Sequence, residues 1–304
     1  MNPILVTGAG GGRQGSTGKR VTELLIGSGL PVRAFVHKLD KRSDELRKLG
    51  AEVVQGDLLD SAAVGRALEG VRRAYFTYPV AEGLLEATTI FASAAREAGI
   101  ELIVNLSQFQ DTPEAPSFRN LQHRLADQIF DWAQVGAVHL QAPPFFEALR
   151  ALIAESVANK DAMFLPLGGG DAVIPMVAAK DVAGAAAALL EQPTRSENRY
   201  DLAAEIRTVN EIAHTLADVL GRPIRYIAVS DEDWKLAARD WLDPFTLDHL
   251  SHLLHFLGTS GIGRGQGGYR ISGWIRSLTG RTPESLEDFL RANAGIFGDH
   301  RQTA

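Results

Sequence analysis

The segment PILVTGAGGGRQGSTGK, residues 3–19, decides the fold of this chain. Its apolar start, Ile4 to Val6, predicts a short buried strand. Gly12, Gly15 and Gly18 follow at intervals of three, and apolar residues 21, 24 and 25 then repeat at the spacing of one helix face. A strand, a glycine-rich loop and a helix in this order are typical of a dinucleotide phosphate site, because small residues let the backbone approach a pyrophosphate at the positively polarised start of the helix.

The glycine spacing alone would also suit a flexible turn. The strand before the glycines and the helix after them are what favour the nucleotide interpretation. The loop from Gly8 to Gly15 is longer than the compact form of this pattern requires. Arg13 lies in the extra length, where its side chain either reaches a phosphate or is solvated.

The composition is that of an ordinary globular protein, with 304 residues, 45% of them hydrophobic and 22% charged. The net charge of −6 argues against a nucleic-acid surface, and the absence of cysteine excludes disulfides, thiolate metal sites and a thiol nucleophile. No apolar run approaches bilayer length, and the chain enters a strand at once without a signal peptide. We therefore expect a cytoplasmic protein, a monomer or homodimer, with no membrane or nucleic-acid partner.

Short apolar strands alternate with helices through the first half of the chain, a pattern typical of a parallel, doubly wound sheet. The predicted strands cover residues 4–6, 32–36, 52–55, 74–77, 102–106 and 138–140. The pattern changes near Pro143. Beyond it we expect a helix over 146–158, a strand over 172–177, an alanine-rich helix over 182–190 capped by Asp181, and a helix opened by the capping-box pair Thr208 and Glu211.

The predicted fold is therefore α/β, with a doubly wound parallel sheet of the Rossmann-like kind. Residues 1–145 would form the NAD(P)-binding domain. Residues 146–298 would form mainly a smaller α+β lobe for substrate, with some strands returning to the main sheet, and residues 299–304 would form a tail. Ligands of such folds collect at the carboxyl ends of the strands, where the smaller lobe would cover them.

Six segments carry a resemblance to a known family: VTGA (6–9), GRQG (12–15), VRAFVH (32–37), GAEVVQGD (50–57), AKDVA (179–183) and LTGRTP (278–283). With them the chain resembles the NmrA-like family of atypical short-chain dehydrogenases/reductases, of the quinone-reductase and triphenylmethane-reductase type. The resemblance implies NAD(P) binding and a small C-terminal substrate lobe. It does not fix a substrate, because the family includes both reductases and catalytically silent nucleotide sensors.

The tip of the second predicted strand selects between the two nicotinamide cofactors, since NAD enzymes place an acid there and a 2′-phosphate requires cations. The tip reads His37-Lys38, with Lys41 and Arg42 close behind and Asp40 offset. These cations either bind a phosphate or form a solvated turn, and we favour NADP(H) over NAD(H). The resemblance places His37 at an adenosine phosphate and Asp57 near the adenine ring, although an aspartate after a strand is also a common turn residue.

The predicted cofactor-binding residues combine the glycine loop with the ends of the central strands. Tyr78, at one such end, would line the nicotinamide pocket or pack at the sheet edge. The full set is Thr7, Gly8, Gly12, Arg13, Gln14, Gly15, Gly18, His37, Lys38, Arg42, Asp57, Leu58, Thr77, Tyr78, Pro79, Ser107, His123, Pro143 and Phe145.

Ordinary short-chain dehydrogenases carry a Tyr-x-x-x-Lys pair on the helix after the fifth strand, where the lysine lowers the tyrosine pKa. This chain departs from that pattern. Arg119 stands at the tyrosine position and His123 at the lysine position, and no tyrosine occurs between Tyr78 and Tyr200. The usual general acid is therefore missing.

Ser107 and His123 are the predicted catalytic residues. Ser107 would end the fifth strand, where it either holds a nicotinamide or substrate oxygen or serves as a turn residue. A histidine with an ordinary pKa can exchange protons at neutral pH, so His123 would give a proton to substrate or hold the nicotinamide ribose. The other interpretation is a surface histidine paired with Asp127 one helical turn on.

Two further groups stand out in the second half. Aromatic residues near the lobe junction line a substrate pocket or form the core; they are Phe145, Phe146, Trp234, Trp241 and Phe245. His249, His252 and His255 recur at every third residue, and ligands at such steps drift around a helix. We therefore favour packing over a metal and predict no metal site.

Together these features predict an NAD(P)H-dependent oxidoreductase that transfers a hydride to a quinone or a related planar aromatic acceptor. Such acceptors delocalise the incoming charge and need little acid assistance, so the missing tyrosine disfavours alcohol oxidation more than quinone reduction. One alternative is a catalytically silent, NADP-sensing regulator of the NmrA type that binds a protein partner. Another is a tailoring enzyme of aromatic polyketide biosynthesis.

Overall fold

A seven-stranded parallel sheet forms the centre of the molecule, with its strands in the order β3-β2-β1-β4-β5-β6-β9. The computed structural model describes residues 2–12, 16–109, 116–192, 196–264 and 268–298. The strands of the sheet are β1 (Ile4–Val6), β2 (Val32–Val36), β3 (Glu52–Gln55), β4 (Arg73–Phe76), β5 (Leu102–Gln108), β6 (Ala137–Ala142) and β9 (Arg199–Asp201). The Rossmann-like fold predicted from the sequence is confirmed.

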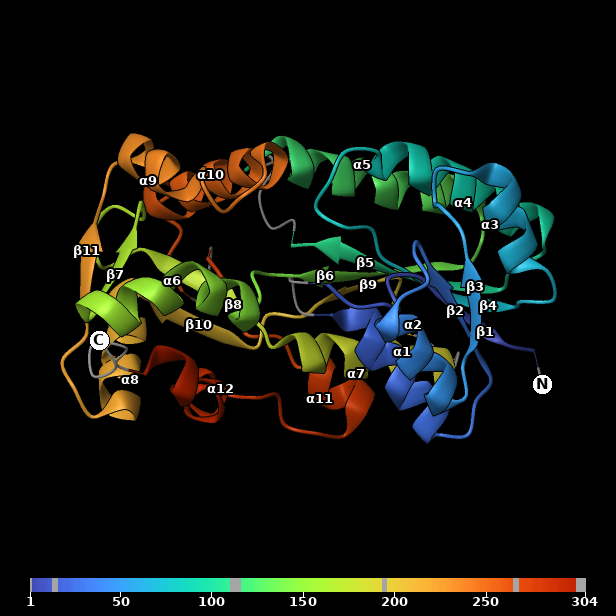
Figure 1. Cartoon of the computed structure of the whole chain (residues 1–304). Helices are drawn as coiled ribbons and strands as arrows, with labels where there is room; N and C mark the ends of the chain where they lie inside the picture. The colour runs from blue at the N-terminus through green and yellow to red at the C-terminus, as the bar shows by residue number, and fades with distance from the viewer. Residues whose placement is uncertain (1, 13–15, 110–115, 193–195, 265–267, 299–304) are drawn as a thin grey trace.

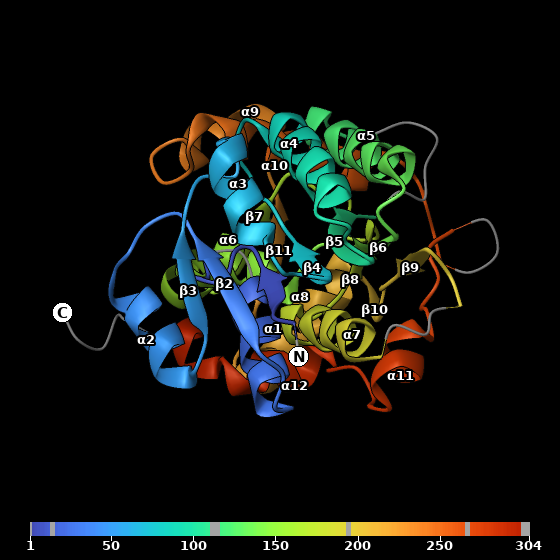
Figure 2. The same cartoon turned by 90° about the vertical axis from the view of Figure 1, so that its right-hand side faces the viewer.

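Helices cover both faces of this sheet (Figures 1 and 2). One face carries α3 (Ser61–Leu68), α4 (Leu84–Glu97) and α5 (Phe118–Ala133). The other carries α1 (Thr17–Gly27) and α7 (Ala179–Glu191), with α11 (Trp274–Thr279) packed on α7 and α2 (Lys41–Leu49) beside β3. Strand β1 shows why both faces are apolar: Ile4 and Val6 belong to the core under α1 and α7, whereas Leu5 belongs to the core under α3 and α4.

The smaller lobe has its own core and two short sheets, one pairing β10 with β8 and the other β11 with β7. In Figure 1 it occupies the end opposite the N-terminus, and α10 runs along the same side of the molecule as α5. Its elements are α6 (Phe146–Lys160), β7 (Ala162–Leu165), β8 (Val173–Met176), β10 (Glu205–Thr208), α8 (Val209–Leu220), β11 (Arg225–Ala228), α9 (Asp231–Ala238), α10 (Pro244–Thr259), α12 (Leu286–Ala292) and the 3-10 turn Ala294–Phe297.

Residues 146–298 do not all lie in the smaller lobe. Strand β9 pairs with β6 at the edge of the main sheet, and α7 packs against α1. Helix α7 also starts earlier than expected, at Ala179, with Ala178 rather than Asp181 at its N-cap. Asp181 instead accepts a hydrogen bond from the backbone N–H of Glu284, 2.8 Å away, and so attaches the chain before α12 to α7.

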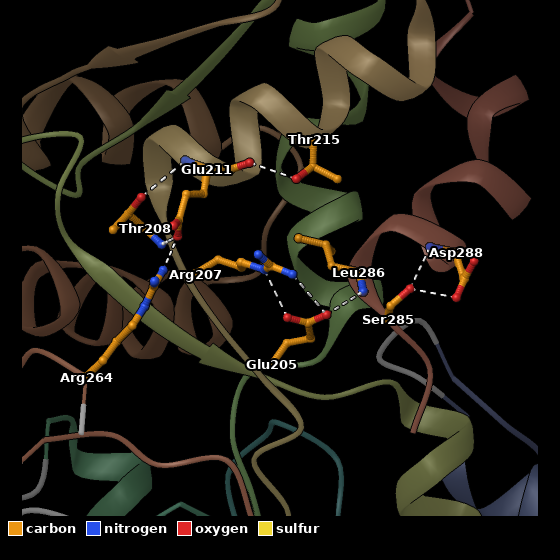
Figure 3. Close-up of polar contacts among 9 residues, drawn as sticks. All are labelled: Glu205, Arg207, Thr208, Glu211, Thr215, Arg264, Ser285, Leu286 and Asp288. Carbon is orange, nitrogen blue, oxygen red and sulfur yellow. Dashed lines mark hydrogen bonds and ion pairs between the residues drawn. The ribbon is translucent and has the colours of Figure 1, made fainter. Parts of the chain in front are cut away.

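The capping box predicted at the start of α8 is confirmed (Figure 3). The Glu211 carboxylate accepts from the Thr208 N–H at 2.7 Å, and Thr208 Oγ1 accepts from the Glu211 N–H at 3.2 Å. Figure 3 also shows Arg264 on the same carboxylate and Arg207 on Glu205. These contacts hold β10, α8 and the chain after α10 together on the outside of the lobe.

The contact between α1 and the end of β1 depends on Gly18. A Cβ on Gly18 would lie 2.4 Å from the carbonyl oxygen of Thr7 and 2.6 Å from the carbonyl of Gly8. Both neighbours are backbone atoms and cannot rotate away. The helix can therefore begin this close to the strand only if residue 18 has no side chain.

We expect Gly18→Ala to lower the free energy of unfolding by roughly 2 kcal/mol, because overpacking forces the backbone apart. Gly27→Ala is the matched control. Gly27 lies in the same helix, and a Cβ there would have no neighbour within 4 Å. That substitution should stabilise α1 by roughly 0.5 kcal/mol or leave stability unchanged. Urea unfolding of the two variants measures both effects, and equal stability of Gly18→Ala and the wild type would contradict the prediction.

Candidate functional site

A single long cleft of about 1090 Å³ runs along the carboxyl ends of β1, β2, β4, β5 and β6 and continues into the smaller lobe. The strand order reverses between β1 and β4, the point at which ligands bind in such sheets. Arg13, Gln14 and Gly15 lie outside the described residues. The predicted residues that line the cleft are Gly8, Gly12, Gly18, His37, Lys38, Arg42, Asp57, Leu58, Thr77, Tyr78, Pro79, Ser107, His123, Pro143 and Phe145.

The glycine loop presents backbone rather than side chains to this cleft. Gly8 and Gly11 adopt positive φ angles of 64° and 71°. Ser16 Oγ donates to the carbonyl of Gly12 at 2.7 Å and forms no cap on α1. The first turn of α1 contains no acidic residue, so its N–H groups and positive end suit a pyrophosphate. The residues present therefore fit a dinucleotide.

Thr7 is the exception among the predicted loop residues, because it does not line the cleft. Its side chain is fully buried, where Oγ1 donates to the carbonyl of Thr77 at 2.9 Å and accepts from the Thr77 N–H at 2.8 Å. This double hydrogen bond joins the ends of β1 and β4. Thr7 thus positions the two strand ends rather than facing a ligand.

Charged side chains gather at the end of the cleft formed by β2 and β3. His37 Nδ1 lies 3.6 Å from Asp57 Oδ2, with both side chains largely exposed. Asp40 caps α2 and binds Arg42 at 2.6 Å. The hydrogen bond from Arg42 lowers the pKa of Asp40, so this carboxylate is charged at neutral pH and offsets one of the cations there.

Ser107, at the end of β5, is held by a buried polar chain. Its hydroxyl donates to Asp127 Oδ2 at 3.0 Å, and Asn105 Nδ2 donates to Asp127 Oδ1 at 2.8 Å. Because the hydroxyl proton points at Asp127, the oxygen of Ser107 can act toward any other group only as an acceptor. The pairing of His123 with Asp127 that the helix spacing allowed is not formed among the described residues.

The series of buried polar side chains behind Ser107 continues from Asp127 to the protein surface. His139 lies between Asp127, with Nδ1 at 3.3 Å from Oδ1, and Asp131, with Nε2 at 3.0 Å from Oδ1. Burial lowers the pKa of His139, but the hydrogen bonds and charges of the two aspartates more than offset it, so the pKa lies above its ordinary value. Arg199, on β9, then binds Asp131 at 2.6 Å.

The structure corrects the titration behaviour expected of His123. Its imidazole is buried against the cleft, 6% exposed. Burial lowers the pKa of His123 well below its ordinary value, and the charge of Arg119 lowers it further. At neutral pH the ring is therefore uncharged: it can hold a hydrogen-bond partner but supplies no imidazolium proton.

Sequence reasoning missed the polar cluster that faces His123 across the cleft. His249 Nδ1 lies 2.8 Å from Ser117 Oγ, and Gln108 Nε2 lies 3.4 Å from His249 Nε2. Burial, with the charge of Arg119, lowers the pKa of His249 to about 3. The triplet spacing had singled out His249, but no pattern indicated that α10 would cross the start of α5.

The other two histidines of the triplet have different partners. His252 lies on the outside of α10 with Asp248, and His255 binds Asp231 of α9 at 2.6 Å. Among the described residues, no group of three metal-binding side chains comes together.

None of the helices that the structure describes is both long enough and apolar enough to span a bilayer.

The half of the cleft inside the smaller lobe is apolar. Phe109 and Tyr269, with ring centres 5.8 Å apart, lie where this chamber begins. Of the aromatic residues singled out from the sequence, Trp241 and Phe145 line the cleft, whereas Phe146 and Trp234 are buried in the lobe core. Most of the chamber wall is aliphatic, formed by Leu149, Leu152, Leu165, Leu167, Ile174, Met176, Leu250, Leu253, Leu254 and Leu257.

Comparison with known proteins gives a consistent result. A family model described as NAD(P)H-binding matches residues 12–193. The chain is 25% identical over 301 residues to an NAD(P)H azoreductase of Xenophilus azovorans, covering 97% of this chain and 99% of that protein. It is 30% identical over 230 residues to a (4-alkanoyl-5-oxo-2,5-dihydrofuran-3-yl)methyl phosphate reductase of Streptomyces griseus, covering 73% of this chain and 76% of that protein.

Among solved structures, the NADPH complex of the quinone oxidoreductase QOR2 of Escherichia coli superposes with a TM-score of 0.81. That match covers 96% of this chain and 99% of the other at 21% identity, so it shows a shared fold. The match to the family model spans more than half of the chain and begins within the glycine loop, at Gly12. The chain belongs to the NAD(P)H-binding family, in agreement with its resemblance to the NmrA-like atypical short-chain dehydrogenases/reductases.

Proposed function

We propose that this protein is an NAD(P)H-dependent reductase that transfers a hydride to a quinone or a related planar, apolar acceptor. The observation that supports this most is the continuity of the cleft: the glycine loop at one end and the apolar chamber at the other are parts of one cavity. A reduced nicotinamide with its pyrophosphate at α1 would reach the lobe junction, near Ser107 and His123. The similarity to an azoreductase supports an acceptor of the same general kind.

The residues at the junction suit hydride transfer that needs little proton assistance. Ser107 presents an acceptor oxygen that would receive an N–H of the nicotinamide carboxamide. His123, uncharged, would hold a ribose hydroxyl or an acceptor oxygen by one hydrogen bond. When bound, the cofactor supplies the hydride, and the protein positions it and excludes water.

The NmrA-type sensor is the second candidate function. The observation that favours it is that neither Arg119 nor His123 can act as a neutral-pH acid in the place of the Tyr-x-x-x-Lys pair. A sensor would bind nucleotide tightly at the same loop and leave the chamber to a protein segment. A tailoring enzyme of aromatic polyketide biosynthesis would use the same cleft for a polycyclic substrate.

Turnover separates these functions. We expect the purified chain to oxidise NADPH in the presence of a panel of quinones and azo dyes, followed by the loss of the reduced-nicotinamide absorbance. Gly18→Ala should remove this activity along with nucleotide binding, whereas Gly27→Ala should retain both. Tight NADPH binding with no oxidation above a protein-free blank for any acceptor would favour the sensor.

The preference for NADP(H) is a proposal that rests on Lys38, Arg42 and His37 at the cleft. We expect Lys38→Ala and Arg42→Ala each to weaken NADPH binding about tenfold, the effect of one charge-assisted hydrogen bond, and to leave NADH binding unchanged. Lys41→Ala is the matched control, because Lys41 lies between them but does not line the cleft. Calorimetric titration with each nucleotide measures these affinities. An equal loss of affinity for NADPH and NADH would show that the two cations do not bind the 2′-phosphate.

The uncharged state of His123 predicts how stability depends on pH. Its folded pKa lies below the unfolded value near 6.5, so the unfolded chain binds the extra proton and stability falls as the pH drops through 6.5. The loss for one such histidine is about 1.4 kcal/mol between pH 7.5 and 5.5. We expect urea unfolding of His123→Gln to show a loss smaller by that amount. An unchanged pH slope in His123→Gln would mean that the imidazole binds a proton as readily in the folded chain as in the unfolded chain.

A further inference from the structure

Arg119 is a buried cation directly behind the cleft wall. Its side chain extends from the first turn of α5, and the residue is only 1% exposed. Nη2 donates to the carbonyl of Pro79 at 2.6 Å, and Nη1 donates to the carbonyl of Ala81 at 3.2 Å. The guanidinium carbon lies 5.9 Å from the ring centres of both Tyr78 and Phe245. The group is thus fixed between the loop after β4 and the start of α10.

No carboxylate forms an ion pair with Arg119 among the described residues, and its Nε is buried without a hydrogen-bond partner. Burial lowers the pKa of Arg119 to about 10, which still leaves the guanidinium charged at neutral pH. A buried charge is normally paired, because removing it from water is costly. Arg33, a half-buried arginine on β2, differs in having a carboxylate beside it: it donates to the carbonyls of Ala67 and Glu69 and lies 3.0 Å from the Glu52 carboxylate.

The field of this charge reaches the cleft. His123 lies one helical turn from Arg119 and His249 lies on α10, and both line the cleft. Arg119 disfavours the protonated form of each. A positive potential that disfavours a cation at these positions favours an anion there by the same physics. Among the described residues, Asp243 is the one carboxylate that lines this half of the cleft. It is the N-cap of α10, and its negative charge opposes the positive potential of Arg119.

We propose that Arg119 stabilises the negative charge that the acceptor gains with the hydride. This inference rests on the proposed reductase function. A quinone that receives a hydride, two electrons and one proton, becomes a hydroquinone monoanion, and a second proton from solvent completes the neutral product. Arg119 lowers the energy of that monoanion by electrostatics alone, without giving up a proton.

The position of Arg119 in the sequence relates this role to that of the usual catalytic tyrosine. The residue stands where the Tyr-x-x-x-Lys pattern has its tyrosine, which meets the same developing negative charge by supplying a proton. A fixed charge in its place favours acceptors whose reduced anion is stable and spread over a ring. It offers less to a simple ketone, whose alkoxide needs a proton at once.

A chromogenic phenol tests the inference without turnover. 4-Nitrophenol resembles a hydroquinone monoanion when ionised and changes colour on ionisation. We expect the full chain, without nucleotide, to bind the phenolate about tenfold more tightly than the phenol, so that the bound probe ionises about one pH unit lower than the free probe. The absence of such a shift in the wild type would overturn the inference regardless of any variant.

Substitutions then assign the effect to Arg119. Arg119→Met removes the charge at similar length and should abolish the probe shift, whereas Arg119→Lys keeps the charge and should retain most of it. In Arg119→Met the pKa values of His123 and His249, followed by NMR, should both rise. Arg33→Met is the matched control: it removes a half-buried arginine held by backbone carbonyls away from the cleft and should leave the probe and both histidines unchanged.

The outcomes separate this inference from the proposed function. If quinones are reduced, Arg119→Met should lower kcat at least tenfold with little change in KM, because it removes stabilisation present only after the hydride has moved. Reduction by the wild type with an unaltered probe shift in Arg119→Met would overturn the role of Arg119 and leave the reductase standing. An Arg119-dependent probe shift with no reduction of any acceptor would overturn the reductase and leave a phenolate-binding cleft.

Discussion

The close approach of α1 to the end of β1 is the constraint on which the rest of this structure depends. With Gly18 against the backbone of Thr7 and Gly8, the helix starts at the mouth of the cleft and points its free N–H groups into it. Thr7 then fixes the end of β4 to the end of β1 through the backbone of Thr77. These few contacts determine where a diphosphate would lie, and hence where a nicotinamide would meet the second lobe.

The two ends of the cleft use polar groups in different ways. At the β2–β3 end the charges are exposed, and acids lie close to two of the basic side chains, Asp40 to Arg42 and Asp57 to His37. At the junction of the lobes the groups are buried, the two histidines are uncharged, and Arg119 provides the positive charge. The first arrangement suits recognition of a solvated nucleotide, and the second suits a reaction in which charge appears in a dry chamber.

Local patterns made the first half of the molecule predictable. The strand, glycine loop and helix follow from periodicity and spacing within about 30 residues, and the structure places the predicted strand ends around one cleft. The errors came from interactions that sequence spacing does not encode. The start of α7 moved because Asp181 is engaged by the backbone at residue 284, more than a hundred residues away. The pKa of His123 is lowered by burial and by the charge of Arg119, and nothing in the helix pattern indicates either effect. The leucines of the chamber have the spacing of an ordinary helix face, so the sequence does not distinguish a cavity wall from a core.

The polar chain behind Ser107 ties the cleft to a late part of the polypeptide. Asp127 and His139 come from the first half of the chain, but the outermost member, Arg199, belongs to β9, which follows α7 in the sequence. A polypeptide emerging from the ribosome could therefore assemble the glycine loop early and still leave Asp131 without its arginine and β6 without its outer neighbour. Separating the two halves by proteolysis or gene splitting would then disturb the serine at the centre of the cleft, even though that serine and its aspartate lie together in the N-terminal piece.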